Sequence, residues 1–382
     1  MKRQAGFSLI EVLVATALML VIMGTTLRAL SDATHANEAV TLMADTQENL
    51  RAAMNYMVKD IVEAGEGVPQ GGISIPNAVT LLTPNPPIAS AINRPGPVGG
   101  PATFPPTFVT LPAITDGPSQ GPQAVTPNPN VPGGVLLGAN TDFITLMYVD
   151  NTIFDPVHNS TLNTFPVYIA AGGGNPGCPA GSIDATGLTV TFDATCITLP
   201  VGNTAIAPGD LIMFQNANGT TLETVTGVAG QTLTFAGGGA GDAFALNASV
   251  QPSGTIVNLQ TPGVVSPGGP FPPTTASRVW MITYYLNTAN PQRPMLMRQV
   301  NFRAATPVAE VIEDLAISYD INAGPPNTNV VEPAWSPNAI RKVNLALAAR
   351  ADNAYSPNKA YFRNNLQTQV SVRSLAFFND FK

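Results

Sequence analysis

The chain has 382 residues, which is enough for two domains or for one elaborated domain. Only 11% of the residues are charged, whereas there are 34 glycines and 36 prolines, a composition that suits an exported protein rich in turns and β-strands. The net charge of −7 and the lack of any run of lysine and arginine argue against a groove that binds nucleic acid.

The first two dozen residues carry the most informative pattern. A short leader, residues 1–6, contains Lys2 and Arg3 and ends at Gly6, and an apolar run begins at once with Phe7. In a secretory signal peptide the cleavage site follows the apolar region, which is then discarded. Here the small residue that a peptidase needs comes before the apolar run. We therefore expect the apolar helix to be retained.

One carboxylate interrupts this apolar run. Residues 7–27 include a single charge, Glu11, and are long enough to cross a hydrocarbon core of about 30 Å as a helix. An ionised glutamate in that core costs about 2.5 kcal/mol or more, so it should have a partner. If the chain is cut after Gly6, the amino group of Phe7 lies about 6 Å along the helix from Glu11. In packed helices, the carboxylate of one can meet the ammonium of the next and set their register.

The order Gly6-Phe7-Ser8-Leu9-Ile10-Glu11 closely resembles the processing site of type IV prepilins and of the pseudopilins of type II secretion. The resemblance implies cleavage after Gly6 and N-methylation of Phe7 by a prepilin peptidase. It also assigns to Glu11 the assembly contact with a neighbouring subunit. The alternative is an ordinary signal anchor whose glutamate lies near the lipid headgroups.

The helix is expected to continue beyond the membrane, over residues 7–66. No proline interrupts residues 7–64, and Gly65 and Gly67, followed by Pro69, supply a stop. Gly24 is a weak point, because glycine costs about 1 kcal/mol relative to alanine in a helix. One stripe with helical spacing is expected to pack against a sheet: Ala36, Val40, Met43, Gln47, Leu50, Met54, Met57 and Ile61.

Residues 67–135 are expected to form a Pro/Gly-rich insertion. From residue 68 onward they hold 16 of the 36 prolines and two charges, Arg94 and Asp116. Prolines break up the apolar pieces, so we expect a largely irregular excursion laid over the surface of a β domain. Recognition of a polyproline segment is the alternative.

Residues 136–382 are expected to form an antiparallel β head, because the hydrophobic period changes to two. Asn218-Gly219 predicts a hairpin turn, and residues 290–294 predict a second turn. Strands are expected at residues 142–149, 188–192, 210–215, 222–226, 233–235, 278–286, 295–302, 317–321, 343–349 and 370–378. The fold class is thus α+β, a pilin-like fold with a long N-terminal helix packed on a large antiparallel sheet.

One branch of the pilin superfamily resembles this chain in particular. The helix end at residues 50–65, the Gly209-Asp210-Leu-Ile hairpin, the strand with Arg298 and residues 311–319 look like a PilW-type minor pilin, which is similar to GspJ-type pseudopilins. The proline-rich insertion and the region of the cysteines are poorly covered by this resemblance. It transfers no function to them.

The two cysteines, Cys178 and Cys196, are expected to form a disulfide if the head lies outside the inner membrane. Closing that loop would contribute about 3 kcal/mol in the chain-entropy model. Two unpaired thiols are the alternative. A metal site is not expected, because His35 and His158 are the only histidines and no thiolate and imidazole cluster occurs at ligand spacing.

Motifs of catalysis are lacking as well, so we expect no enzyme and no cofactor. The sequence contains no G-x-S-x-G elbow, no H-E-x-x-H and no phosphate loop that ends in Gly-Lys-Ser/Thr. The expected function is that of a minor pilin that helps initiate or cap a type IV pilus, with other pilins, the prepilin peptidase and the inner membrane as partners and with a periplasmic head. The alternatives are a type II secretion pseudopilin and a membrane-tethered adhesive or binding module.

Overall fold

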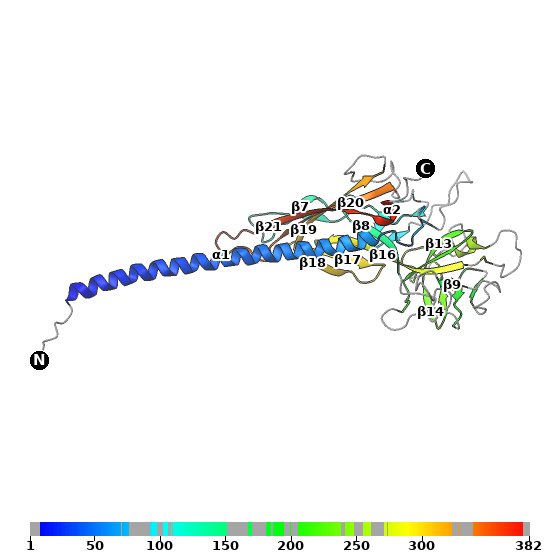
Figure 1. Ribbon diagram of the computed structural model, residues 1–382, viewed down its shortest axis with the longest axis horizontal. Helices are drawn as coiled ribbons and strands as arrows, with labels where there is room; N and C mark the ends of the chain where they lie inside the picture. The colour runs from blue at the N-terminus through cyan, green and yellow to red at the C-terminus, as the bar shows by residue number, and fades with distance from the viewer. Residues whose placement is uncertain are drawn as a thin grey trace.

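The computed structural model is an elongated molecule in which a long helix projects from a β-rich head (Figure 1). The structure describes residues 8–69, 71–75, 92–97, 102–105, 108, 110–150, 167–169, 181–184, 186–194, 199, 205–237, 241–247, 255–260, 271–272, 274–322, 328 and 339–376. The predicted fold class is confirmed, since a long N-terminal helix is followed by a large antiparallel sheet domain.

Helix α1 spans Leu9–Glu63 without a break. Its first half extends away from the head, and its second half lies along the head (Figure 1). The predicted stop is confirmed: Gly65 has φ +82°, and a Cβ atom there would lie 2.3 Å from the Ser374 hydroxyl oxygen. The chain then joins the sheet at once, because the Gly65 N–H donates to the Met147 carbonyl at 2.8 Å.

The predicted apolar stripe on α1 is correct only in its second half. Leu50, Met54, Met57 and Ile61 are buried in the main core. Ala36, Val40, Met43 and Gln47 are exposed, and the residues buried at that level are Leu42 and Thr46 instead. The first half of the prediction is therefore wrong as a core face. Periodicity shows which apolar side chains share a face, but the position of the head decides which face is covered.

The large sheet is built around β16 (Thr274–Asn287), the longest strand in the described parts of the chain. All of its pairings are antiparallel. The main path runs β13 (Gly219–Thr224), β12 (Leu211–Asn216), β16, β17 (Met295–Val300) and β18 (Thr306–Glu310). Strands β8 (Ile144–Asp150) and β9 (Val167–Ile169) also pair with β16, and β5 (Ile114–Thr115) pairs with β8. Both predicted hairpins are confirmed, as β12–β13 and β16–β17.

A three-stranded sheet covers the other side of the main core. It consists of β19 (Ile312–Ile321), β20 (Ile340–Arg350) and β21 (Arg363–Ser371). Alternate residues of β19 and β20 face inward, so that α1 and the two sheets enclose one hydrophobic core. The expected strand at residues 370–378 is wrong at residues 372–376, because the strand ends at Ser371 and α2 (Arg373–Ala376) follows; residues 377 and 378 lie outside the described residues. Val372, just before this helical turn, and Leu375, within it, both pack into the core.

A second, smaller core lies at the end of the head that is farther from the projecting half of α1 (Figure 1). Its sheet has the order β10 (Ser182–Ile183), β11 (Thr189–Thr191), β15 (Thr232–Thr234) and β14 (Gly227–Ala229). The 3-10 helix η2 (Ile256–Leu259) closes it. Phe214 of β12 packs edge to face on Phe235 with ring centroids 5.4 Å apart, which joins this lobe to the large sheet.

In the described part of the proline-rich segment, short paired strands alternate with longer stretches without regular secondary structure. Strand β1 (Ile73–Ser74) pairs with β4 (Thr110–Leu111), β2 (Asn93–Arg94) with β3 (Ala102–Thr103), and β6 (Gln123–Thr126) with β7 (Val135–Asn140). Arg94 fastens this segment to the large sheet, since its Nε donates to the Thr145 hydroxyl at 2.7 Å. Its guanidinium also lies 4.2 Å from the ring centroid of Phe143. Burial lowers the pKa of Arg94 to about 9, so it is still charged at neutral pH.

A buried carboxylate on α1 holds the helix to the large sheet. Asp60 is 3% exposed, and its carboxylate accepts hydrogen bonds from the Tyr284 hydroxyl at 2.6 Å and from the Arg298 Nε at 2.7 Å. Burial is the largest single influence on the pKa of Arg298 and lowers it, but the hydrogen bond and charge of Asp60, together with Tyr284, outweigh burial, so that the pKa is raised. Helix, β16 and β17 therefore meet at one charge-assisted contact.

We expect Asp60→Ala to lower the free energy of unfolding by about 3 kcal/mol, because Arg298 and Tyr284 lose the partner of a buried ion pair. The measurement is urea-induced unfolding of the full chain in detergent, followed by tryptophan fluorescence. Lys59→Ala is the matched control, since Lys59 is exposed on the same turn. Equal losses in the two variants would contradict the role given to Asp60.

A second buried carboxyl group lies where β13 meets η2. Glu223 is 3% exposed, and its Oε1 accepts a hydrogen bond from the Ile256 N–H at 3.1 Å. Burial raises its pKa well above the usual value, and the nearby charge of Asp242 raises it further. The group is therefore stable in the fold in its neutral form.

We expect Glu223→Gln to be more stable than the wild type at pH 8 by about 1 kcal/mol or more and to match it near pH 4.5. The contribution of a group with a raised pKa is fully present below its unfolded-state pKa and is lost as the pH rises through its folded-state pKa. Urea unfolding of both proteins across this range measures the difference, and Asp242 is common to both. A difference that does not change with pH would refute the assignment.

Candidate functional site

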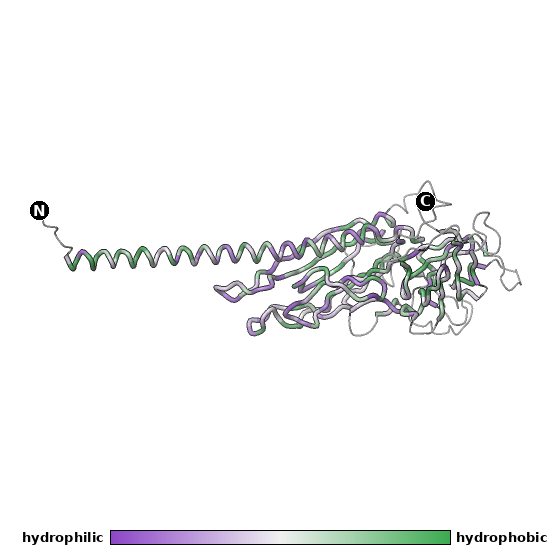
Figure 2. Tube along the Cα trace, turned by 90° about the horizontal axis from the view of Figure 1, so that it is seen from below, coloured by the Kyte–Doolittle hydropathy of each residue, from purple (hydrophilic) through white to green (hydrophobic). Residues whose placement is uncertain are grey.

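The first half of α1 forms a continuous apolar surface that the head does not cover. Every residue from Leu9 to Leu30 is exposed. An 18-residue window of this helix has a mean hydropathy of 2.1, and none of it is buried. Figure 2 shows this part of the tube as mostly hydrophobic, in contrast to the loops of the head. By length and composition the helix can cross a membrane.

Glu11 takes part in a capping box at the start of this helix. The Ser8 N–H donates to Glu11 Oε2 at 3.1 Å, and the Glu11 N–H donates to the Ser8 hydroxyl oxygen at 3.3 Å. This reciprocal pair satisfies two backbone donors that a helix N-terminus leaves without partners. It also holds the carboxylate at the helix start, while Glu11 Oε1 makes no hydrogen bond within the described residues.

A shallow hollow lies beside this carboxylate. Its lining consists of Glu11, Val12, Ala15, Thr16 and Met19, and its volume is about 490 Å³. Ala15 and Thr16 are small, and the Thr16 hydroxyl donates back to the Leu13 carbonyl at 3.0 Å instead of projecting outward. The helix surface next to Glu11 is thus low and apolar, which allows the backbone of a second helix to approach closely.

The predicted weak point at Gly24 lies within the unbroken helix. The hydroxyl of Thr25 donates to the Ile22 carbonyl at 2.9 Å, and that of Thr26 donates to the Met23 carbonyl at 2.9 Å. Such back-bonding competes with the main-chain ladder and often bends a helix. The stretch combines a glycine with two hydroxyl side chains, yet its conformation in the isolated chain is helical.

Of the residues that the sequence predicts for the site, the structure describes only Glu11. Glu11 lies on the exposed apolar helix, and its role in assembly stays a prediction. Gly6 and Phe7 lie outside the described residues, as do both cysteines of the predicted disulfide, Cys178 and Cys196.

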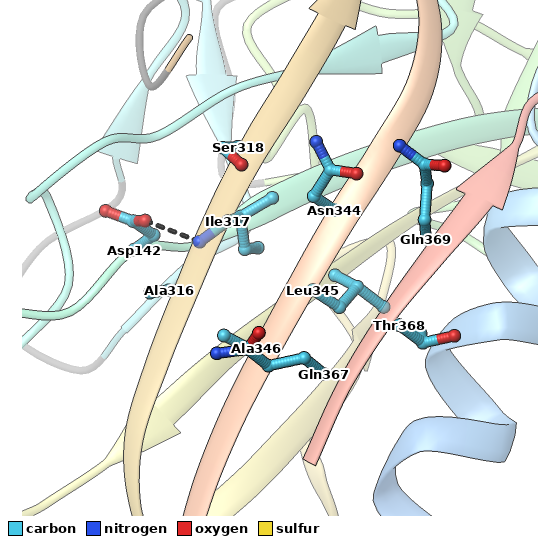
Figure 3. Close-up of a pocket in the computed structure, with 10 residues that line it drawn as sticks. All are labelled: Asp142, Ala316, Ile317, Ser318, Asn344, Leu345, Ala346, Gln367, Thr368 and Gln369. Atoms are coloured by element: carbon cyan, nitrogen blue, oxygen red, sulfur yellow. Dashed lines mark hydrogen bonds between the residues drawn. The ribbon is translucent and has the colours of Figure 1, made fainter. Parts of the chain in front are cut away.

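A polar trough that the sequence did not reveal lies on the outer face of β19, β20 and β21 (Figure 3). The trough has a volume of about 570 Å³, and its lining includes Ser318, Asn344, Gln367 and Gln369. A signal was present in the alternation of polar and apolar residues along β20 and β21, which predicts a polar outer face. The alternation does not show that the small side chains of Ala316 and Ala346 leave the centre of this face lower than its edges.

The trough suits binding through hydrogen bonds better than catalysis. The carboxylate of Asp142, at its rim, accepts the N–H of Ile317 at 2.7 Å and the N–H of Ser119 at 2.7 Å. Both oxygens are thus used to fix the backbone, as the dashed line to Ile317 in Figure 3 illustrates. Among the described residues no group of three or more histidine, cysteine, aspartate or glutamate side chains is placed to hold a metal ion.

Comparison with known proteins supports the N-terminal part of this description. Residues 1–27 match the family model described as the prokaryotic N-terminal methylation motif. No curated protein and no solved structure matches the chain. The matched motif is the signal of type IV pilin-like and pseudopilin precursors, which are structural proteins and not enzymes. With the exposed apolar helix, it fits a membrane-anchored, pilin-like protein.

Proposed function

We propose that the chain is a minor pilin that helps initiate or cap the assembly of a type IV pilus. The observation that carries the proposal is the surface of α1, where an exposed apolar helix with one carboxylate near its start forms the larger part of the matched methylation motif. In the membrane, lipid covers this surface. In a filament, the corresponding helices of other pilins cover it, so the same residues serve as anchor and as assembly interface.

The size and placement of the head support a minor role. A single helix carries two sheets, each packed on the main core, and a further lobe extends beyond the end of α1 (Figure 1). Such bulk is awkward for a subunit repeated along a thin filament, but it can be accommodated at an end. The resemblance of residues 50–65, Gly209-Asp210-Leu-Ile and the Arg298 strand to PilW-type minor pilins supports the same proposal.

The uncovered face of α1 continues past the membrane span. Val40 is 65% exposed and Met43 is 48% exposed, although both are large and apolar. At about 100° per residue, Val40 lies about 160° around the helix from Leu42, which the head covers. Helices of other pilins can therefore reach this face while the head stays on the opposite side.

Glu11 supplies the charged contact in this arrangement. Its Oε2 accepts a hydrogen bond from the Ser8 N–H of its own subunit, and its Oε1 makes no hydrogen bond within the described residues, which leaves it available to a partner outside the subunit. The α-amino group of a neighbouring processed subunit has the matching charge. Pairing removes the cost of about 2.5 kcal/mol or more of leaving a carboxylate alone in an apolar environment, and it sets the axial offset of the two helices.

We expect Glu11→Ala to abolish or reduce pilus assembly at least about tenfold while membrane insertion stays normal, because an apolar helix inserts without the carboxylate. Pili are counted on cells that lack the wild-type copy, and the variant is quantified in inner-membrane fractions. Glu48→Ala, at an exposed position of α1 near the head, is the matched control.

Unchanged assembly with Glu11→Ala would reject the proposal and favour a membrane-tethered adhesive or binding module. Loss of protein secretion with normal piliation would instead identify a type II secretion pseudopilin.

We also expect the mature protein to begin at an N-methylated Phe7, with the leader of residues 1–6 removed. Mass spectrometry of the N-terminal peptide measures both events, and cells without the prepilin peptidase provide the control. A protein that keeps Met1 to Gly6 in peptidase-competent cells would show that residues 1–27 act only as a signal anchor.

A further inference from the structure

The long connection between β20 and β21, residues 351–362, reaches from the three-stranded sheet back to α1. We call it the latch loop. It is internally braced: the Tyr355 N–H donates to the Ala360 carbonyl at 2.8 Å, and the Lys359 N–H donates to the Tyr355 carbonyl at 2.8 Å. Lys359 has φ +57°, a left-handed conformation that closes the turn. The loop therefore has a defined shape of its own.

The root of the latch loop is fixed to the sheet by charged groups. Glu313 of β19 lies 3.1 Å from the Nε of Arg350 and 2.8 Å from the Nε of Arg363. The Arg350 guanidinium also lies 4.5 Å from the ring centroid of Tyr361, within the loop. Arg350 is 1% exposed, so this end of the loop belongs to the rigid part of the head.

The tip of the latch loop contacts α1 at residues 35–38. The Ser356 N–H donates to Glu38 Oε1 at 3.1 Å, and the Ser356 hydroxyl donates to the same oxygen. The Tyr355 ring lies edge to face on the imidazole of His35, with centroids 6.3 Å apart. The hydroxyl bond from Ser356 lowers the pKa of Glu38, which agrees with a contact made to the carboxylate form.

Between this contact and the main core, only two residues of α1 are buried. Leu42 and Thr46 are the buried residues of α1 between Glu38 and Leu50. Glu38 precedes Leu50 by about 18 Å and Asp60 by about 33 Å along the helix axis. Two attachment points at such a separation fix the direction of a helix, whereas one buried cluster near its end does not.

We propose that the latch loop is a releasable latch that fixes the direction in which α1 leaves the head. Closed, it holds residues 35–49 of the helix against the head. Open, it leaves the helix attached through the core from Leu50 onward, so that the head can tilt relative to the membrane-spanning part. This inference does not depend on the proposed function.

The two attachments differ in a way that suits this role. The contact at Asp60 is buried, and its two partners come from the centre of the large sheet. The contact at Glu38 is at the surface, with a side chain 30% exposed, and consists of a few polar bonds. Exposed polar bonds contribute little to stability, so breaking this contact costs little compared with unfolding of the head.

Hydrogen exchange of the full chain in detergent micelles tests the latch. In Glu38→Ala we expect residues 35–49 to exchange about tenfold faster than in the wild type, while residues 50–63 do not change. Alanine has the highest helix propensity, so faster exchange cannot come from a weaker helix. Glu38→Gln should keep most of the protection, because its amide oxygen can accept the same bonds from Ser356.

The matched control is Asp45→Ala, an exposed position of α1 outside the latch contact, which should exchange like the wild type. Tyr355→Ala removes the ring contact from the loop side and should also speed exchange of residues 35–49. Wild-type exchange of this segment in both Glu38→Ala and Tyr355→Ala would overturn the proposal. Faster exchange of residues 50–63 to the same extent would overturn it as well, since the loop would then only stabilise the whole head.

Discussion

Helix α1 must satisfy two different surroundings along one unbroken backbone. Its first half is apolar on every side and needs lipid or other apolar helices, whereas its second half needs the head on one face and water on another. The contact of Asp60 with Tyr284 and Arg298 meets the requirement of the second half, because it fixes this part of the helix to the centre of the large sheet. The first half then projects from the head into its own surroundings. The exposure of Val40 and Met43 follows from this geometry, since the covered face turns away from them.

A chain with few charges places several of them inside. Asp60, Arg94 and Arg350 are all buried, and each is hydrogen-bonded or ion-paired across elements distant in sequence. Burying a charge costs much unless it is paired, so these contacts specify which strands and loops come together. Buried charged groups also hold the root of the latch loop, whereas its tip contacts the partly exposed Glu38 at the surface. Buried charged contacts therefore join the strands and loops within the head, whereas only a surface contact joins the latch loop to residues 35–38 of α1.

Much of the fold could be predicted because it depends on local chemistry. The glycines after residue 64 end the helix, and Asn218-Gly219 turns the β12–β13 hairpin. The predictions for the first half of the helix stripe and for residues 372–376 were wrong, because each depends on which surface packs nearby. In the candidate functional site, too, one feature could be predicted from the sequence and others could not. Glu11 stands out in the sequence as a lone carboxylate, but neither its capping box with Ser8 nor the trough beside Asn344 can be seen there.

By itself, the sequence determined that this chain has a methylation motif, a retained apolar helix and an antiparallel head, since these depend on residue order over short spans. Only the tertiary structure decided which face of α1 the head covers, where Asp60 finds its partners and that residues 351–362 reach Glu38. The partners of Asp60 lie 224 and 238 positions away, and Ser356 lies 318 positions from Glu38. No local pattern encodes such distances, because they arise only when the sheets close on the helix.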